Sequence, residues 1–139
     1  MDKKDFIEWA RKLQQSYQSS GDVKSKLAKV DLLAIVGPTG VGKTTLINQL
    51  KIPSVLSDVT RDLRKGEKNN QNYHFREDYL DILKEIKSGE FAQFLVSDTD
   101  DFYGTHANAY PDEGWCSMAI FATAIPDFRK LGFRKVVPI

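Results

Sequence analysis

One short run of residues carries chemistry that can be recognised from the sequence alone. It reads Gly37-Pro38-Thr39-Gly40-Val41-Gly42-Lys43-Thr44-Thr45 and fits G-x-x-x-x-G-K-[ST], the pattern of a phosphate-binding loop. Glycines let the backbone of such a loop curl so that its N–H groups point at phosphate oxygens. Lys43 then reaches the β- and γ-phosphates of a nucleoside triphosphate, and the Thr44 hydroxyl binds Mg²⁺.

A second group of residues has the chemistry of a phosphate site. Arg61 and Arg64 lie in a charged loop with Glu67, and guanidinium groups match phosphate oxygens through paired N–H groups. Tyr73 and Tyr103 each adjoin a tight turn and offer a phenolic donor. Residue chemistry alone favours a solvated charged loop here. Combined with the phosphate-binding loop, however, the arginine pair indicates two phosphorylated ligands that meet head to head, as in a phosphotransferase.

The elements that position these residues follow from apolar periodicity. The phosphate-binding run lies between an apolar strand at residues 32–36 and a short helix at 46–50. Further strands are predicted at 54–60, 73–75, 91–96, 102–105, 117–121 and 135–139, and further helices at 77–88, capped by Gly89, and at 125–131. Residues 1 to about 20 predict an amphipathic helix, with Asp2 as its N-cap and an apolar stripe of Phe6, Trp9, Ala10, Leu13 and Tyr17.

Composition limits the remaining possibilities. The chain has 139 residues, a net charge of +1 and one cysteine, Cys116. This balance gives no global attraction to nucleic acid or to an acidic membrane, so we expect neither as a partner. No apolar run is long enough to span a bilayer, and the first residues are not typical of a signal peptide. We therefore expect a cytoplasmic protein. The first helix is expected to dock on the main body; the alternative is that it contacts a partner protein.

The motifs together resemble the guanylate kinase family. Beyond the phosphate-binding loop, the resemblance rests on Ser57-Asp58-Val59-Thr60-Arg61-Asp62-Leu63-Arg64-Lys65-Gly66-Glu67, Tyr73-His74-Phe75, Gly89-Glu90-Phe91 and Tyr103-Gly104-Thr105. It implies an α/β fold with a P-loop nucleotide-kinase core, a parallel sheet with flanking helices, at residues 31–52 and 109–139. A small mixed-sheet GMP-binding subdomain is inserted at residues 53–108, and residues 1–30 form the N-terminal helix and connector.

The family transfers phosphate from ATP to GMP with Mg²⁺, and its motifs imply a role for each matching position. ATP is bound by the run Gly37, Pro38, Thr39, Gly40, Val41, Gly42, Lys43, Thr44 and Thr45, with Mg²⁺ at Thr44. Lys43 and Arg61 are the implied catalytic residues. The implied GMP site consists of Ser57, Arg61, Arg64, Tyr73, Gln93, Tyr103 and Thr105, in which the arginines and tyrosines hold phosphate and Ser57 and Thr105 contact guanine.

The sequence also departs from the family pattern. Gln93 stands where the family has a carboxylate that reads guanine, and residues 117–122 lack the acids that the family places after the insertion. The chain ends at Ile139, before the family's arginine-bearing helical lid, so we expect no C-terminal lid. The helix after the phosphate-binding loop is shorter than the family's.

Two functional classes therefore remain open. One is a guanylate kinase of reduced activity in this chain, and the other is a weakly active or inactive guanylate-kinase-like module that binds nucleotide or a protein partner. A third, weaker alternative is a prenyl-transferring enzyme of transfer RNA, in which a Gly-Pro-Thr opening also occurs. The Arg61, Arg64 and Tyr73 pattern argues against it.

Overall fold

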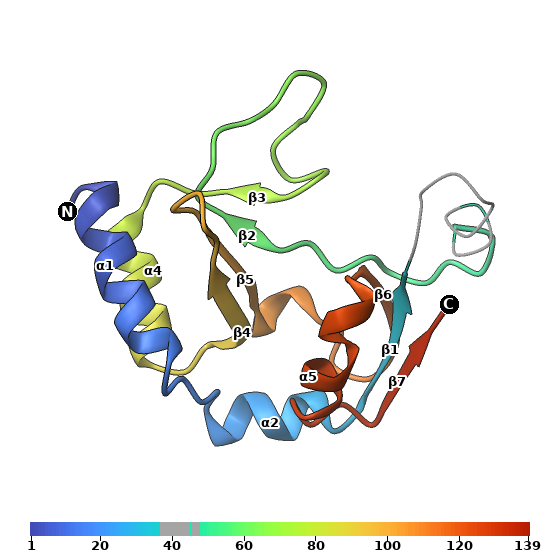
Figure 1. Ribbon diagram of the computed structural model, residues 1–139. Coiled ribbons are helices and arrows are strands. Elements are labelled where there is room, and N and C mark those ends of the chain that lie inside the picture. Colours follow the sequence, from blue (N-terminus) through green and yellow to red (C-terminus); the bar gives the residue numbers. More distant parts are fainter. Residues whose placement is uncertain (37–44, 46–47) are drawn as a thin grey trace. The chain divides into compact units, whose positions relative to one another are not determined.

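The computed structural model describes residues 1–36, 45 and 48–139 (Figure 1). These residues form two compact units: Met1–Val23 with Leu56–Ala109, here the first unit, and Lys24–Val55 with Tyr110–Ile139, the second unit. The first unit thus combines the N-terminal helix with most of the predicted insertion. The predicted boundaries at residues 30, 52 and 108 stay a prediction.

The first unit contains a small mixed sheet of four strands in the order β3-β2-β5-β4. Its strands are β2 (Asp58–Val59), β3 (His74–Phe75), β4 (Phe91–Val96) and β5 (Phe102–His106). β2 runs parallel to β3 and antiparallel to β5, which in turn pairs antiparallel with β4. A short 3₁₀ turn, η1 (Ala107–Ala109), follows β5.

Two helices, α1 (Lys3–Gln14) and α4 (Tyr79–Lys87), pack against each other in the first unit, and α1 also packs against β4 (Figure 1). Their apolar residues share one core with three strand phenylalanines, in the set Phe6, Ile7, Ala10, Ile82, Leu83, Ile86, Phe91, Phe94 and Phe102. Asp2 caps α1 as predicted, because its carboxylate accepts the N–H of Asp5 at 2.8 Å. The apolar face of the first helix is therefore buried within its own unit.

The predicted stripe of α1 is wrong at two positions. Trp9 is 46% exposed, with the ammonium groups of Lys12 and Lys87 over its ring, and Ile7 is buried instead. The helix also ends at Gln14, so Tyr17 lies beyond it. Tyr17 is nevertheless anchored, because its hydroxyl donates to the Phe91 carbonyl at 2.5 Å and accepts the Phe91 N–H at 3.0 Å.

The segment after α1, which was predicted to be a connector, is partly helical. They form α2 (Gly21–Leu27), in which Val23 and Leu27 are buried. Two apolar residues four positions apart are enough to anchor one helical face, although the segment around them is charged. Gly89 ends α4 as predicted, with a φ of 71°. A Cβ at Gly89 would lie 2.7 Å from the backbone nitrogen of Ser20, so glycine also permits this close chain approach.

The second unit contains a parallel three-stranded sheet in the order β6-β1-β7. Its strands are β1 (Val30–Ile35), β6 (Gly114–Ala119) and β7 (Lys135–Pro138). The turn η2 (Ala122–Ala124) and the helix α5 (Ile125–Arg129) connect β6 to β7. In β1, Asp31 is buried, and its carboxylate forms a two-pronged ion pair with the guanidinium of Arg134 that lowers the pKa of Asp31.

Most predicted strand boundaries lie within two residues of the observed ones, and two predicted strands differ more. The strand expected at 117–121 begins earlier, at Gly114, and Phe121 beyond its end is 84% exposed. The strand expected at 54–60 is divided between two sheets. Pro53 and Val55 form backbone hydrogen bonds with Ser117 of the parallel sheet, whereas only Asp58–Val59 joins the mixed sheet. One predicted strand therefore contributes residues to both sheets.

Candidate functional site

The two predicted phosphate sites differ in what the structure describes. Gly37, Pro38, Thr39, Gly40, Val41, Gly42, Lys43 and Thr44 lie outside the described residues, and Thr45 is helical and exposed. The roles of Lys43 and Thr44, and their expected convergence with Arg61 and Arg64, stay predictions. The residues expected to bind the second phosphorylated ligand all lie in the first unit.

Strand alternation places these residues on one face of the mixed sheet. Gln93 pairs with Thr105 across β4 and β5, and Tyr103 pairs with Val59 of β2. Cross-strand partners share a face, and neighbours along a strand point to opposite faces. Phe91, Phe94 and Phe102, which form the core with α1 and α4, therefore point away from Tyr103 and Thr105. The face that carries the candidate site is the one opposite the helices.

Arg61 is held in place before any ligand arrives. Its Nη1 and Nη2 atoms donate to the two oxygens of Glu67, each at 2.7 Å, and Nη1 also donates to the Asp62 carbonyl at 3.0 Å. The guanidinium lies over the rings of Tyr73 and Phe75, at 5.1 and 5.4 Å from their centroids. Its side chain is only 9% exposed. The Glu67 partnership raises the pKa of Arg61, which stays charged.

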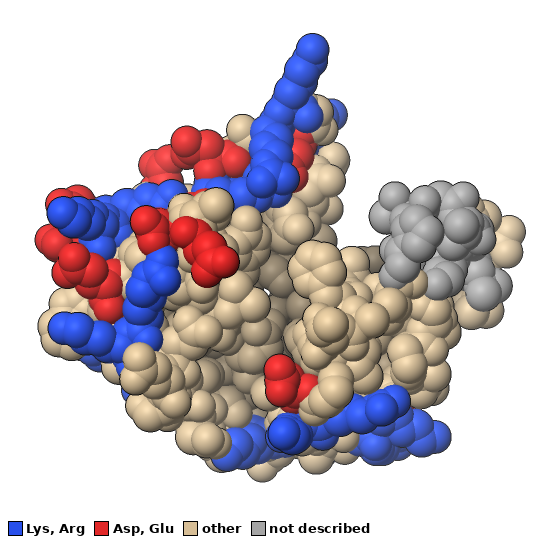
Figure 2. Space-filling view, in the orientation of Figure 1, with Lys and Arg blue, Asp and Glu red and all other residues tan. Residues whose placement is uncertain are grey.

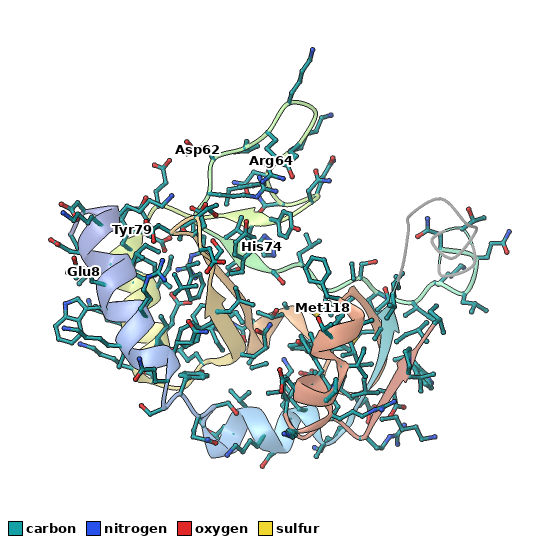
Figure 3. The ribbon with its side chains drawn as sticks, in the orientation of Figure 1. Glu8, Asp62, Arg64, His74, Tyr79 and Met118 are labelled. Atoms are coloured by element: carbon teal, nitrogen blue, oxygen red, sulfur yellow. The ribbon has the colours of Figure 1, made fainter. Side chains whose placement is uncertain are left out.

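Glu67 connects Arg61 to the rest of the loop. It also accepts the backbone N–H of Arg64 at 2.7 Å. The hydrogen bond from Arg61, supported by that from the Arg64 backbone, lowers the pKa of Glu67 to about 2. The Arg64 side chain itself is exposed. Figure 2 shows Lys and Arg side chains along the loop between β2 and β3, and Figure 3 labels Asp62 and Arg64 on it.

The arrangement leaves part of Arg61 available to an anion. A guanidinium carries five N–H groups, and three of those of Arg61 are used by Glu67 and Asp62 among the described residues. The Nε–H and one Nη2–H remain, on one edge of the planar group. Tyr103 lies close by, because its ring is 6.5 Å from that of Tyr73, centroid to centroid. Guanidinium and phenol together suit a phosphate group.

A second polar group occupies the same face two residues further along β5. Thr105 is fully buried, and its Oγ1 lies 3.0 Å from both the Ser57 Oγ and the Gln93 Nε2. Tyr103 and Thr105 are two residues apart, which corresponds to ~7 Å along a strand. This is a spacing over which one nucleotide can present its phosphate and its base. The structure therefore brings Ser57, Gln93 and Thr105 together, beside the Arg61 cluster.

Arg76 connects strand β2 to helix α4 on the side of the sheet opposite the candidate site. Its five N–H groups donate to three carboxylates: to Asp58 at 3.0 Å, to Asp78 at 2.9 and 2.6 Å, and to Glu85 at 2.8 and 2.7 Å. Burial raises the pKa of Asp58, outweighing the opposite effect of Arg76. His74, labelled in Figure 3, is the cross-strand partner of Asp58. Asp58 directly follows Ser57 in the chain, so its bond to Arg76 helps to fix the position of that site residue.

Two contributors to the site were missed from the sequence. The Phe75 ring contacts the Arg61 guanidinium and Glu67 binds it, although both residues belong to motifs that are visible in the sequence. The alternation in Tyr73-His74-Phe75 was a usable signal for Phe75, because the first and third residues of a strand share a face. No comparable periodicity joins Glu67 to Arg61 within a loop.

Neither a metal cluster nor a membrane span is found in the parts of the chain that the structure describes. Residues 1–36, 45 and 48–139 contain no group of three or more His, Cys, Asp or Glu side chains that could hold a metal ion. The Mg²⁺ site predicted at Thr44 lies outside these residues and stays a prediction. Within the same ranges, no helix has the length and apolar character needed to cross a membrane.

Comparisons with known proteins give a consistent result. The chain is 38% identical over 98 residues to a guanylate kinase of Schizosaccharomyces pombe, which covers 63% of this chain and 46% of that protein. It is 36% identical over 107 residues to a guanylate kinase of Campylobacter jejuni, covering 70% of this chain and 50% of that protein. No protein-family model matches the chain.

A solved structure shows the same fold. The crystal structure of guanylate kinase from Anaplasma phagocytophilum aligns with a TM-score of 0.51 and 23% identity, over 81% of this chain and 60% of that one. The predicted α/β fold class, with a parallel sheet and a small mixed sheet, is confirmed. The chain spans half or less of the length of the two curated relatives described above.

Proposed function

The chain belongs to the guanylate kinase family, as its motifs predicted, and we propose that it is a nucleoside monophosphate kinase that converts ATP and GMP to ADP and GDP. ATP is assigned to the phosphate-binding run at residues 37–45, and GMP to the helix-free face of the mixed sheet. Mg²⁺ is assigned to Thr44, where it would screen charge on the ATP phosphates. The cytoplasmic location and the absence of nucleic-acid and membrane partners stay predictions, as does the alternative that the first helix contacts a partner protein.

One observation supports the GMP assignment above the others: Arg61 is fixed in advance with one edge left for an anion. Positioning a charged group before the ligand arrives avoids the entropic cost of ordering it on binding. The guanidinium lies over the Tyr73 ring, which is 6.5 Å from the Tyr103 ring, and the Ser57, Gln93 and Thr105 group lies at the spacing expected for the nucleotide base. The face can therefore orient one nucleotide by both of its ends.

The reaction itself needs little from the protein beyond this orientation. A phosphate oxygen of GMP attacks the γ-phosphorus of ATP, a new P–O bond forms, and the bond to the β-phosphate oxygen breaks as ADP leaves. The attacking oxygen is already ionised, so no strong general base is required. Arg61 is proposed to hold the acceptor phosphate and to offset the charge that crowds the transition state, with Lys43 acting on the donor phosphates.

A second candidate function is a nucleotide-binding module that turns over slowly or not at all. The observation that favours it lies in the second unit. β6 ends at Ala119, and the segment Ser117–Ala122 at its carboxyl end contains no carboxylate. Ligands of open parallel sheets bind at the carboxyl ends of the strands. This end of β6 therefore lacks an acidic side chain that could help to bind Mg²⁺ or the guanine base.

A coupled assay with ATP, Mg²⁺ and GMP separates the two candidates. Formation of ADP that depends on GMP and is lost in Lys43→Ala supports the kinase. If ADP formation is no greater than in Lys43→Ala but GMP binding is measurable, the kinase is refuted and the nucleotide-binding module is supported. Failure to bind GMP at millimolar concentration refutes the kinase and the assignment of GMP to the mixed sheet.

A further inference from the structure

The group formed by Ser57, Gln93 and Thr105 contains no ionisable side chain. Thr105 is fully buried at its centre, while Ser57 and Gln93 are half-buried and flank it. A nucleotide base that contacts this group can therefore form hydrogen bonds only with neutral donors and acceptors. The hydrogen bonds within the group determine which of its atoms donate and which accept.

The amide of Gln93 is fixed by Thr105. The Gln93 Nε2 donates one of its two N–H groups to Thr105 Oγ1 at 3.0 Å, and this bond fixes which way the amide faces. The Gln93 carbonyl oxygen is then the acceptor that the amide offers to a ligand, beside its second N–H.

The hydroxyl of Ser57 is directed by the same residue. A buried hydroxyl such as that of Thr105 is expected to place its own proton in a hydrogen bond. Among the described residues, the available acceptor is the Ser57 Oγ, 3.0 Å away. Thr105 therefore donates to Ser57, and the Ser57 proton is directed to a ligand. The Ser57 hydroxyl therefore serves as a donor to a ligand, and the Gln93 carbonyl oxygen serves as an acceptor.

This donor and acceptor match one edge of the purines. A 6-oxopurine offers a carbonyl acceptor at C6 beside the N1–H donor, which pair with Ser57 and Gln93 respectively. Adenine reverses both positions, with an amino donor at C6 and an acceptor at N1. The 2-amino group that separates guanine from hypoxanthine has no counterpart in the group. A carboxylate at position 93 would instead accept from N1–H and the 2-amino group together.

We propose that Gln93, held by Thr105, makes this site selective for 6-oxopurine nucleoside monophosphates without regard to the 2-amino group, so that inosine monophosphate is accepted as well as GMP. This inference rests on the proposed function, because it assumes that the base of the acceptor nucleotide meets Ser57 and Gln93. Thr105 is the positioning residue, and Gln93 determines the specificity.

Isothermal titration of the 139-residue chain with GMP, inosine monophosphate and AMP tests the proposal, with saturating ADP present to occupy the phosphate-binding loop. GMP and inosine monophosphate are expected to bind within ~3-fold of each other, and AMP at least ~100-fold more weakly, because two contacts are mispaired. If GMP does not bind, the proposed function fails. If GMP binds but inosine monophosphate binds more than ~10-fold more weakly, the inference alone is overturned.

Two variants report on the mechanism through affinity ratios, which a general loss of folding does not alter. Gln93→Glu is expected to favour GMP over inosine monophosphate by ~10-fold or more, since the carboxylate gains a partner in the 2-amino group. Thr105→Val releases the Gln93 amide and the Ser57 hydroxyl, so discrimination against AMP should fall by ~10-fold or more. Thr99→Val makes the same chemical change at an exposed turn and should leave all three affinities unchanged. Unchanged ratios in both site variants would overturn the proposal.

Discussion

Replacing Arg61 by lysine tests whether the fixed guanidinium is the anchor of the acceptor phosphate. The change keeps the positive charge and removes the planar group that Glu67 holds by two hydrogen bonds of 2.7 Å. An ammonium has three donors, so it can stay with Glu67 or turn to a phosphate, but it cannot form both sets of contacts. It also loses the cation–π contacts that the guanidinium makes with the rings of Tyr73 and Phe75.

The size of the effect follows from the contacts that are lost. The free edge of Arg61 offers two N–H groups to an anion, and lysine in competition with Glu67 retains at most one equivalent contact. One charge-assisted hydrogen bond contributes ~1.5–3 kcal/mol. At 1.4 kcal/mol for each factor of ten, the dissociation constant for GMP should rise ~10–100-fold.

Titration calorimetry of GMP binding measures the effect, and Lys65→Arg provides the matched control. Lys65 is an exposed residue of the same loop, so this conservative exchange should leave GMP affinity within ~2-fold. Binding of GMP to Arg61→Lys within ~2-fold of the parent chain would show that the guanidinium does not hold the phosphate. If the dissociation constant for GMP rises in Lys65→Arg as well as in Arg61→Lys, the effect comes from a change in the whole loop rather than from the lost guanidinium.

Three further predictions concern stability and ionisation. Gly104→Ala should lower the free energy of unfolding by ~1–3 kcal/mol in urea, because its Cβ would lie 2.6 Å from the Phe102 ring; Gly21→Ala, in open space, should not lower it. Tyr17→Phe should lower it by ~1–3 kcal/mol, because the hydroxyl's bonds to the Phe91 backbone are lost, and an unchanged urea midpoint would contradict this. Carbon-detected NMR should give Glu67 a pKa of about 2, which reverts toward 4.5 in Arg61→Lys. Since this pKa is lowered on folding, the ion pair stabilises the loop above about pH 4.5, and the contribution is lost as pH falls toward 2.

Much of the first unit could be predicted because strand alternation is a local property of the sequence. The pattern Phe91-Ala92-Gln93-Phe94-Leu95-Val96 predicts a strand, and the strand is present with those bounds. The tyrosine and threonine of Tyr103-Gly104-Thr105 lie on one face, as their spacing requires. The convergence of Ser57, Gln93 and Thr105 was implied by family motifs, whereas their hydrogen bonds required the structure.

The features that sequence reasoning missed depend on contacts between distant segments. Trp9 fits a helical stripe as well as Ile7 does, and only the position of α4 decides which of them is buried. The division of residues 54–60 between two sheets depends on Ser117, more than fifty residues away in the chain. Glu67 and Arg61 are six residues apart in an irregular loop, where no repeat predicts which carboxylate will meet which cation.

In the mixed sheet, core packing and ligand recognition are coupled, because residues of the core alternate with residues of the candidate site along the same strand. Gly104 lies between Tyr103 and Thr105, and the Phe102 ring and the Phe94 Cβ approach it so closely that no Cβ fits. The aromatic core that packs against α1 and α4 thus determines the position of β5. The position of β5 in turn determines where Tyr103 and Thr105 point. A substitution on the core face should therefore shift affinity for phosphate and base together, whereas Gln93→Glu should act on the base alone.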